Sequence, residues 1–187
     1  MDSRMSEDHR GSQFVVGVTG PLGAGVTTTT HALAANGFNR LSLSDPIKKE
    51  LLARENRPAD TLFNAKHFPD WRRKLQDLGN EKRREYRGYW VDRALADVSA
   101  SDQELVIDGI RNLGEIEALR DRFPRFFVVA IHAGAAVRWE RLREAYDGSQ
   151  KNFNRDDLRD WYEETPEGQQ VEKCVLAADF GACPVNS

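Results

Sequence analysis

A glycine-rich segment between an apolar run and a helical pattern is the feature that most constrains the fold of this chain. Residues 20–27 read Gly-Pro-Leu-Gly-Ala-Gly-Val-Thr and follow the apolar run Phe14–Thr19. Glycine tolerates the backbone angles at which successive N–H groups turn inward, and the start of the next helix adds a positive end. The pattern therefore predicts a strand, an anion-binding loop and a helix in direct succession.

Short β-branched or aromatic runs bounded by turn residues predict buried strands. The runs are Phe14–Thr19, Asn39–Leu43, Glu104–Asp108 and Arg125–His132. Helical patterns fill the gaps, and strands that alternate with helices form a parallel sheet covered on both faces. We expect an α/β fold with three layers, α/β/α, and a mostly parallel central sheet of about five strands. The tail Asp179–Ser187 would supply the fifth strand.

The helices are predicted from apolar spacing, caps and stops. They cover Val26–Asn36, a segment that opens at Asp45-Pro46, two helices between Pro69 and Ala100 with a break near Gly88, Leu113–Arg122, Ala135–Tyr146, Arg155–Tyr162 and Pro166–Ala177. A polar break is expected at Asp147–Asn154. Ligands of such sheets bind at the carboxyl ends of the strands.

Composition excludes several classes of protein. The chain has 187 residues, 40% hydrophobic and 30% charged, which suits one globular domain. No apolar run approaches the ~18 residues of a membrane span, and Met1–Gln13 has no apolar signal core, so we expect a cytoplasmic protein with a disordered leader. The net charge of −3 and two isolated cysteines favour neither nucleic-acid binding nor a metal cluster.

The lysine of the common phosphate-loop pattern GxxxxGK[ST] is replaced by Val26. That lysine normally bridges the terminal phosphates and offsets charge during transfer. Either an arginine elsewhere supplies the charge, or the domain binds nucleotide without efficient turnover. A glycine-rich turn without a ligand is a further interpretation. The residues expected to contact nucleotide are Gly20, Pro21, Leu22, Gly23, Ala24, Gly25, Val26, Thr27 and Thr28.

With this degenerate Walker A loop, the chain resembles the P-loop nucleotide kinases, especially deoxynucleoside-monophosphate kinases, dephospho-CoA kinases and relatives fused to deaminases. The other matching segments are Leu41–Asp45, Val106–Asn112, the arginines of residues 138–143, Gln169–Val171 and Ala178-Asp179. The resemblance implies a P-loop domain over residues 14–187, after a leader at 1–13. Within it, an acceptor region would span about 55–100 and a lid about 138–165.

The resemblance also implies roles for individual residues. Thr27 and Asp108 would hold Mg²⁺, although Asp108 is alternatively a helix cap or turn residue. Ser44 and Asp45 would contact the acceptor or merely cap the next helix, and Asn112 would join them. Arg111 would bind the acceptor phosphate in a bidentate manner. The lid arginines would close over the phosphates. These are Arg138 and Arg141, with Arg143 expected in solvent.

A basic cluster at residues 72–87 is typical of a solvated helix face, although some members would line the acceptor pocket. The aromatic residues Trp71, Tyr89 and Trp90 fit a core better than a base-stacking platform. Both interpretations stay open for these residues.

The leading hypothesis is Mg²⁺-dependent phosphoryl transfer from ATP to a small acceptor, most plausibly a (deoxy)nucleoside monophosphate. The alternative is a degenerate nucleotide-sensing module that keeps the loop and lacks turnover. An NTPase that drives a partner, and a hydrolase built on Asp108 and Asp45, remain further alternatives. The acceptor's identity, a homodimer and fusion to a downstream domain stay open.

Overall fold

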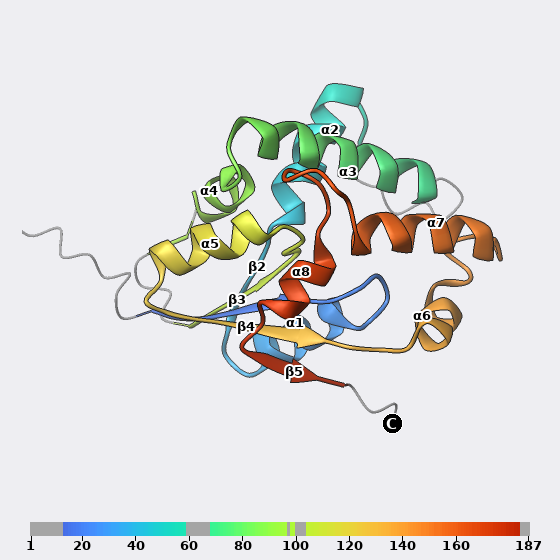
Figure 1. Cartoon of the computed structure of the whole chain (residues 1–187). Coiled ribbons are helices and arrows are strands. Elements are labelled where there is room, and N and C mark those ends of the chain that lie inside the picture. Colours follow the sequence, from blue (N-terminus) through green and yellow to red (C-terminus); the bar gives the residue numbers. More distant parts are fainter. Residues whose placement is uncertain (1–12, 59–67, 97, 100–103, 184–187) are drawn as a thin grey trace, which may run out of the picture.

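The computed structural model describes residues 13–58, 68–96, 98–99 and 104–183, which form a parallel sheet between helices (Figure 1). The strands are β1 (Phe14–Thr19), β2 (Asn39–Ser42), β3 (Glu104–Asp108), β4 (Arg125–Ile131) and β5 (Phe180–Ala182). Their order across the sheet is β2-β3-β1-β4-β5, and each neighbouring pair is parallel. The predicted fold class is confirmed.

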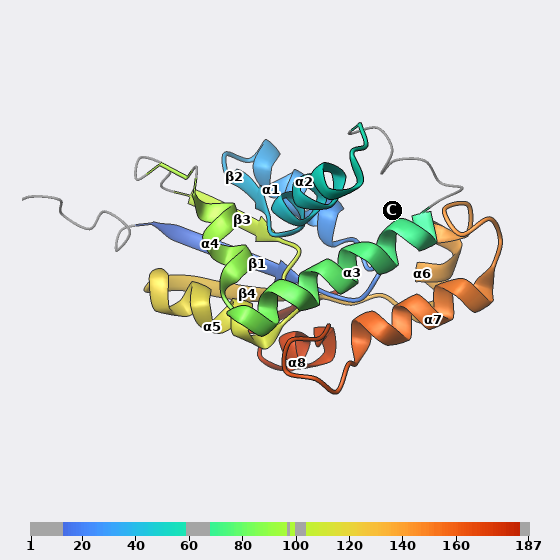
Figure 2. The same ribbon diagram turned by 90° about the horizontal axis from the view of Figure 1, so that it is seen from above.

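Helices lie on both faces of the sheet. They are α1 (Val26–Ala35), α2 (Ser44–Glu55), α3 (Phe68–Glu85), α4 (Tyr89–Leu95), α5 (Leu113–Arg122), α6 (Ala135–Leu142), α7 (Gln150–Trp161) and α8 (Val171–Leu176). Figure 2 shows α3 and α7 side by side, with α6 close to the start of α7.

The two faces of the sheet bury different apolar side chains, because successive residues of a strand point to opposite faces. On one face, Val15 and Ile107 pack against α4, α5 and α8 through residues such as Val91 and Ile116. On the other face, residues of β1, β3 and β4 pack against α1. Burial on both faces explains why the strands are continuous apolar runs.

The predicted end of one helix and the predicted starts of two others are wrong. The helix expected over Ala135–Tyr146 ends at Leu142, where the chain passes into turns. The helix expected from Arg155 begins at Gln150, because the Ser149 side chain accepts a hydrogen bond from Asn152 N. The helix expected from Pro166 begins only at Val171, because the preceding backbone bonds elsewhere: Gln170 N donates to Arg111 O at 2.7 Å.

The predicted leader lies outside the described residues except for Gln13. This residue is 1% exposed, and its Nε2 donates to Ser99 O at 3.4 Å.

Among the described segments, no helix combines the length and apolar character needed to cross a bilayer.

Close packing of Ile110 and Phe126 against β1 requires a glycine at Gly17. A Cβ atom added there would lie 2.7 Å from Ile110 Cδ1 and 2.8 Å from the Phe126 ring. Such overpacking forces neighbouring side chains off their preferred rotamers.

We predict that Gly17→Ala lowers the melting temperature by about 3–9 °C, from a cost of roughly 1–3 kcal/mol. Differential scanning calorimetry measures this. Gly181→Ala in β5 is the matched control, because nothing lies within 4 Å of a Cβ there. Equal melting temperatures for the two variants would contradict the packing argument.

Candidate functional site

A cavity of about 790 Å³ opens at the carboxyl ends of β1 and β3. Its wall includes the whole segment 18–29, the exit of β3 at Asp108–Arg111, and side chains from α2, α3, α6 and α7. The fold therefore brings together the glycine-rich loop and the basic helix α3, which are far apart in sequence. This is the place where parallel α/β sheets bind ligands.

The loop between β1 and α1 adopts the glycine-dependent backbone that its sequence predicts. Gly23 has a φ of 79°, and Gly25, the N-cap of α1, has a φ of 109° and a ψ of 17°. Residues with side chains rarely adopt these angles. The turn is closed by a hydrogen bond of 3.0 Å from Ala24 N to Pro21 O.

The start of α1 lies in the cavity wall and has backbone N–H groups without acceptors inside the helix. The first hydrogen bond of the helix runs from Thr29 N to Gly25 O at 2.9 Å. The amides of Val26, Thr27 and Thr28 precede it, so the helix itself offers them no acceptor. All three residues line the cavity. An anion can satisfy such groups, and the helix dipole favours it there.

Val26 anchors the loop to the core. Its side chain packs against the buried cluster that contains Val18, Ala24 and Ile131. Its Cγ2 lies 3.2 Å from the position that a Cβ atom on Gly20 would take. The valine thus contributes packing at the position where the common pattern has a cation.

Asp108 is buried, and it forms an ion pair with the partly exposed Arg40. Its Oδ2 accepts from Arg40 Nη2 at 2.6 Å and lies 3.0 Å from the Thr30 hydroxyl, while Arg40 Nε donates to that hydroxyl at 3.1 Å. The Asp108 side chain is 6% exposed. Since the side chain bonds to groups on α1 and β2, Asp108 caps no helix. No feature of the sequence marks Arg40 as a functional residue, because it lies in the exposed half of the short strand β2.

Asp160 on α7 joins two arginines at another part of the cavity wall. Its Oδ2 accepts from Arg111 Nη1 at 2.6 Å and from Arg72, and its Oδ1 accepts from Gln76 Nε2 at 2.5 Å. Burial opposes ionisation, but Arg111 and Arg72 outweigh it and hold the pKa of Asp160 below the usual range of an aspartate. The carboxylate therefore stays charged and keeps both guanidinium groups in the wall.

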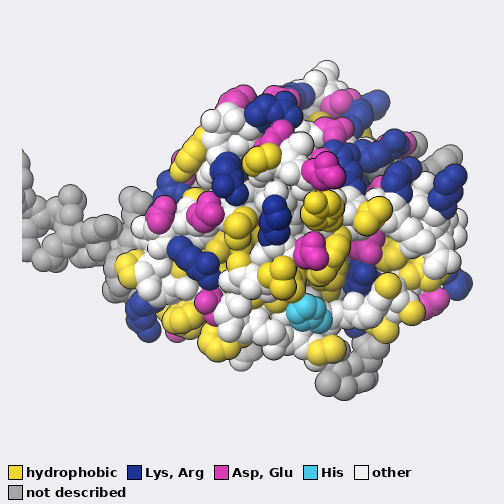
Figure 3. Space-filling model, in the orientation of Figure 1, with side chains coloured by type: hydrophobic (Ala, Val, Ile, Leu, Met, Phe, Trp, Pro, Cys, Tyr) yellow, Lys and Arg dark blue, Asp and Glu magenta, His cyan; other side chains and the backbone are white. Residues whose placement is uncertain are grey.

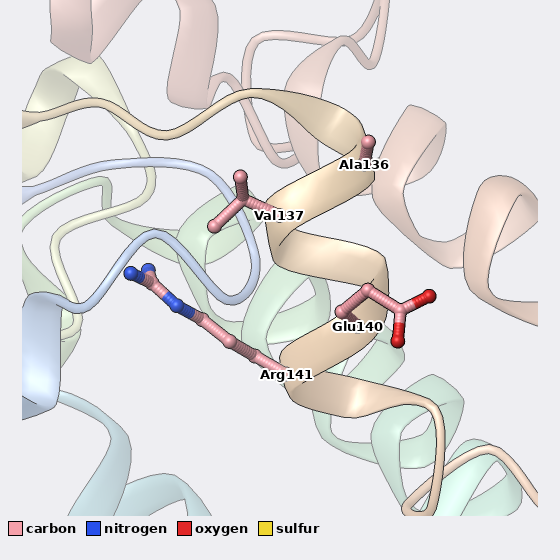
Figure 4. Close-up of a pocket in the computed structure, with 4 residues that line it drawn as sticks. All are labelled: Ala136, Val137, Glu140 and Arg141. Carbon is pink, nitrogen blue, oxygen red and sulfur yellow. The ribbon is translucent and has the colours of Figure 1, made fainter. Parts of the chain in front are cut away.

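The two lid arginines occupy different environments. Arg138 is buried, and its N–H groups donate to Ala133 O, Leu22 O and the Asp157 carboxylate, so it braces the loop from outside the cavity. Arg141 lines the cavity and donates to Gly23 O and Ala24 O, each at 3.1 Å. Figure 4 shows Arg141 extending toward the loop and Glu140 pointing away from it.

Three residues expected at the acceptor site behave differently from one another. Ser44 lines the cavity, with its Oγ 2.9 Å from Ser42 Oγ, whereas Asp45 is exposed and pairs with Lys48. Neither is a cap, because α2 is preceded by Leu43 without a side-chain cap. Asn112 is buried outside the cavity wall, and its side chain bonds only backbone groups: it caps α5 and donates to Pro166 O and Gly168 O.

Similarity to known proteins places the chain in a family. It is 30% identical over 160 residues to the UPF0200 protein of Thermococcus kodakarensis, covering 80% of this chain and 78% of that protein. The UPF0200 protein of Methanothermobacter thermautotrophicus is also 30% identical, over 135 residues, although the chain spans only 62% of its length. The chain belongs to the UPF0200 family. No protein-family model matches it.

The UPF0200 chain shares its fold with TT1252 from Thermus thermophilus. The two structures align with a TM-score of 0.52 over 94% of this chain and 90% of the other, at 18% sequence identity. This likeness concerns the architecture alone. The function of the UPF0200 chain is therefore argued from its own site.

The basic cluster of α3 divides between surface and cavity. Figure 3 shows basic and acidic side chains interspersed along the upper part of the molecule. Lys74 pairs with Glu55 at 2.9 Å and Arg84 with Glu167 at 3.0 Å, which suits a solvated face. Arg72 and Arg83 instead line the cavity, and Arg83 pairs with the buried Glu115 at 3.0 Å.

We predict that Asp160→Asn in the UPF0200 chain lowers the free energy of unfolding at pH 7 by roughly 2–4 kcal/mol, because two guanidinium groups lose their counter-ion. Since the pKa of Asp160 is lower in the folded state, its contribution is present above the aspartate pKa of an unfolded chain, about 3.9, and is lost as the pH falls further. Urea titrations at several pH values should therefore show a shallower acid dependence for the variant.

Asp77→Asn is the control for this measurement. The Asp77 side chain is 66% exposed and pairs with Arg159, so we expect a change of less than about 0.5 kcal/mol. If Asp160→Asn changes the free energy of unfolding as little as this control does, the buried carboxylate does not stabilise the fold.

Proposed function

We propose that this UPF0200 chain transfers the terminal phosphoryl group of ATP to a small anionic acceptor, most plausibly a (deoxy)nucleoside monophosphate. The observation that carries the proposal is the shared cavity: the phosphate loop lines one part of its wall, and Arg111 lines another. One enclosed space therefore has groups for a donor phosphate and groups for a second anion.

The loop amides and Arg141 would hold the phosphates of ATP. Backbone N–H groups at Val26–Thr28 provide the helix-start site, and the Arg141 guanidinium lies at the adjoining carbonyl oxygens of Gly23 and Ala24. Arg138 would act as a positioning residue, since its contact with Leu22 O fixes the loop. Arg141 thereby supplies positive charge near a loop that has no lysine.

Arg111 would bind the acceptor's phosphate. Its side chain is 31% exposed, and one of its nitrogens is held by Asp160, which fixes the direction of the fork. In the transfer, an acceptor oxygen attacks the γ-phosphorus in line, the bond to the β-phosphate oxygen breaks, and ADP leaves with the electron pair. The protein contributes positioning and positive charge, and no covalent intermediate is needed.

Magnesium fits this site through few protein groups. Within the described residues, no three His, Cys, Asp or Glu side chains cluster as a metal site. Thr27 and Asp108 both line the cavity with the hard oxygen atoms that Mg²⁺ prefers, and Mg²⁺ keeps several waters and phosphate oxygens as ligands. The bound ion would neutralise phosphate charge. Arg40 already occupies one oxygen of Asp108, which favours a water-mediated contact.

A second candidate is a nucleotide-sensing module that binds without turnover. The packing of Val26 into the core favours it, because the loop gains stability where an enzyme has its lysine. The candidates differ in whether bound ATP is consumed. A coupled assay over nucleoside monophosphates and dephospho-CoA, run beside ATP titration calorimetry, separates them. ATP binding without phosphoryl transfer supports the sensing module. Absence of ATP binding contradicts both the kinase and the module.

We predict that Arg141→Met weakens ATP binding by about tenfold or more, because a charge-assisted contact to phosphate is lost. Arg143→Met is the matched control, since its side chain is 61% exposed and lies near Glu140; its ATP affinity should change by less than about twofold. Titration calorimetry measures both. Similar losses for the two variants would show that Arg141 has no special position.

We also predict opposite outcomes for Val26→Lys under the two candidates. A sensing module should gain ATP affinity of about tenfold, because the restored ammonium reaches the terminal phosphates. An enzyme that relies on Arg141 should gain little, because a second cation adds repulsion. Titration calorimetry and the coupled assay report both. Ala35→Lys controls for added charge, because Ala35 is exposed at the end of α1 and lies outside the cavity wall.

A further inference from the structure

Two glutamine side chains in the cavity wall have carbonyl oxygens that lack a hydrogen-bond partner among the described residues. Gln76 on α3 is 5% exposed and Gln169, just before α8, is 2% exposed; the Oε1 of each is buried. Both line the cavity. A buried carbonyl without a donor is costly, so two in one wall point to a ligand that donates hydrogen bonds.

The orientation of the Gln76 amide follows from its neighbour. Its Nε2 lies 2.5 Å from Asp160 Oδ1, and an ionised carboxylate only accepts hydrogen bonds. The NH₂ group must therefore face Asp160, which leaves Oε1 as a pure acceptor. A ligand that satisfies it needs an N–H or O–H donor.

Arg72 adds a complementary group on the same face of α3. It precedes Gln76 by four residues, a spacing that places side chains on one face of a helix. Its Nε is also buried without a partner in the described part of the chain. Arg72 and Gln76 also bond to the same Asp160 carboxylate, so a buried donor and a buried acceptor lie in one part of the wall. The edges of nucleobases carry the matching pattern of adjacent acceptors and donors.

An apolar stripe runs alongside these polar groups. Trp71 and Leu75, again four residues apart, line the cavity together with Ile47 of α2. Such a surface suits the flat face of a ring better than a cluster of sugar hydroxyls.

We propose that Gln76, Gln169 and Arg72 recognise the nucleobase of the acceptor, while Arg111 holds its phosphate. This inference rests on the proposed function for the identity of the acceptor, and it makes the two glutamines specificity-determining residues. The recognised ligand is a nucleoside monophosphate whose base carries an N–H donor next to an acceptor. A phosphorylated sugar has hydroxyl donors, but it lacks a flat ring to pack against Trp71 and Leu75 and an edge with a donor next to an acceptor.

The test is titration calorimetry of the full chain, without ATP, against AMP, GMP, CMP, UMP and ribose 5-phosphate. We expect at least one nucleotide to bind about tenfold or more tightly than ribose 5-phosphate, because unpaired buried polar groups penalise a ligand that lacks the base. Gln169→Met should weaken that nucleotide by about tenfold and change ribose 5-phosphate by less than about threefold. Gln76→Met should act in the same direction.

Gln150→Met is the matched control, because Gln150 is exposed at the start of α7, and it should leave every affinity unchanged. Melting curves confirm that each variant is folded. Three outcomes overturn the proposal: ribose 5-phosphate binds as tightly as the nucleotides, the methionine variants weaken both ligands equally, or the variants melt higher with unchanged affinity. The proposal is also overturned if none of the five ligands binds.

Failure of the proposed function is distinguishable from these outcomes. It appears as an absence of ATP binding or of phosphate transfer, whereas acceptor recognition is measured with no ATP present. If the protein binds a nucleotide through Gln169 and never phosphorylates it, the inference on base recognition stands and the proposed kinase activity is wrong.

Discussion

The arrangement of the cavity wall depends on the hydrogen bonds that the Asp160 carboxylate accepts. This carboxylate lies on α7 and bonds to Arg72 and Gln76 on α3 and to Arg111 after β3. One buried charge therefore sets the direction of two guanidinium groups and one amide. Taking that charge out of water is costly, and the cost is offset only because several donors converge on it.

The phosphate loop depends on a different balance. Its backbone angles require glycine, the first amides of α1 have no acceptor within the helix, and the Val26 side chain packs against the core. The positive charge near the loop comes from Arg141 on α6, a separate element. Because α6 is a separate element, the position of this charge relative to the loop depends on how α6 packs against α7.

Much of the fold could be predicted because its signals are local. The β1 strand, the loop and the start of α1 follow from a contiguous segment, and the strand ends at Glu104–Asp108 agree with the structure residue for residue. The start of α7 was missed, because the Ser149 cap lies inside a polar segment that also resembles a loop. The expectation that Asn112 contacts substrate remains untested, but its side chain is committed to backbone groups that only folding brings near.

The sequence by itself determined the strand–loop–helix unit, the alternation that yields a parallel sheet, and the edge of the sheet at which the cavity opens. These follow from steric limits on the backbone and from the periodicity of apolar residues, which act over a few residues. Only the tertiary structure decided which polar groups meet there. Arg40 with Asp108, and Asp160 with Arg72, are separated by 68 and 88 residues, and their pairing depends on how layers pack. Long-range pairing leaves no local pattern, so no reading of neighbours along the chain reveals it.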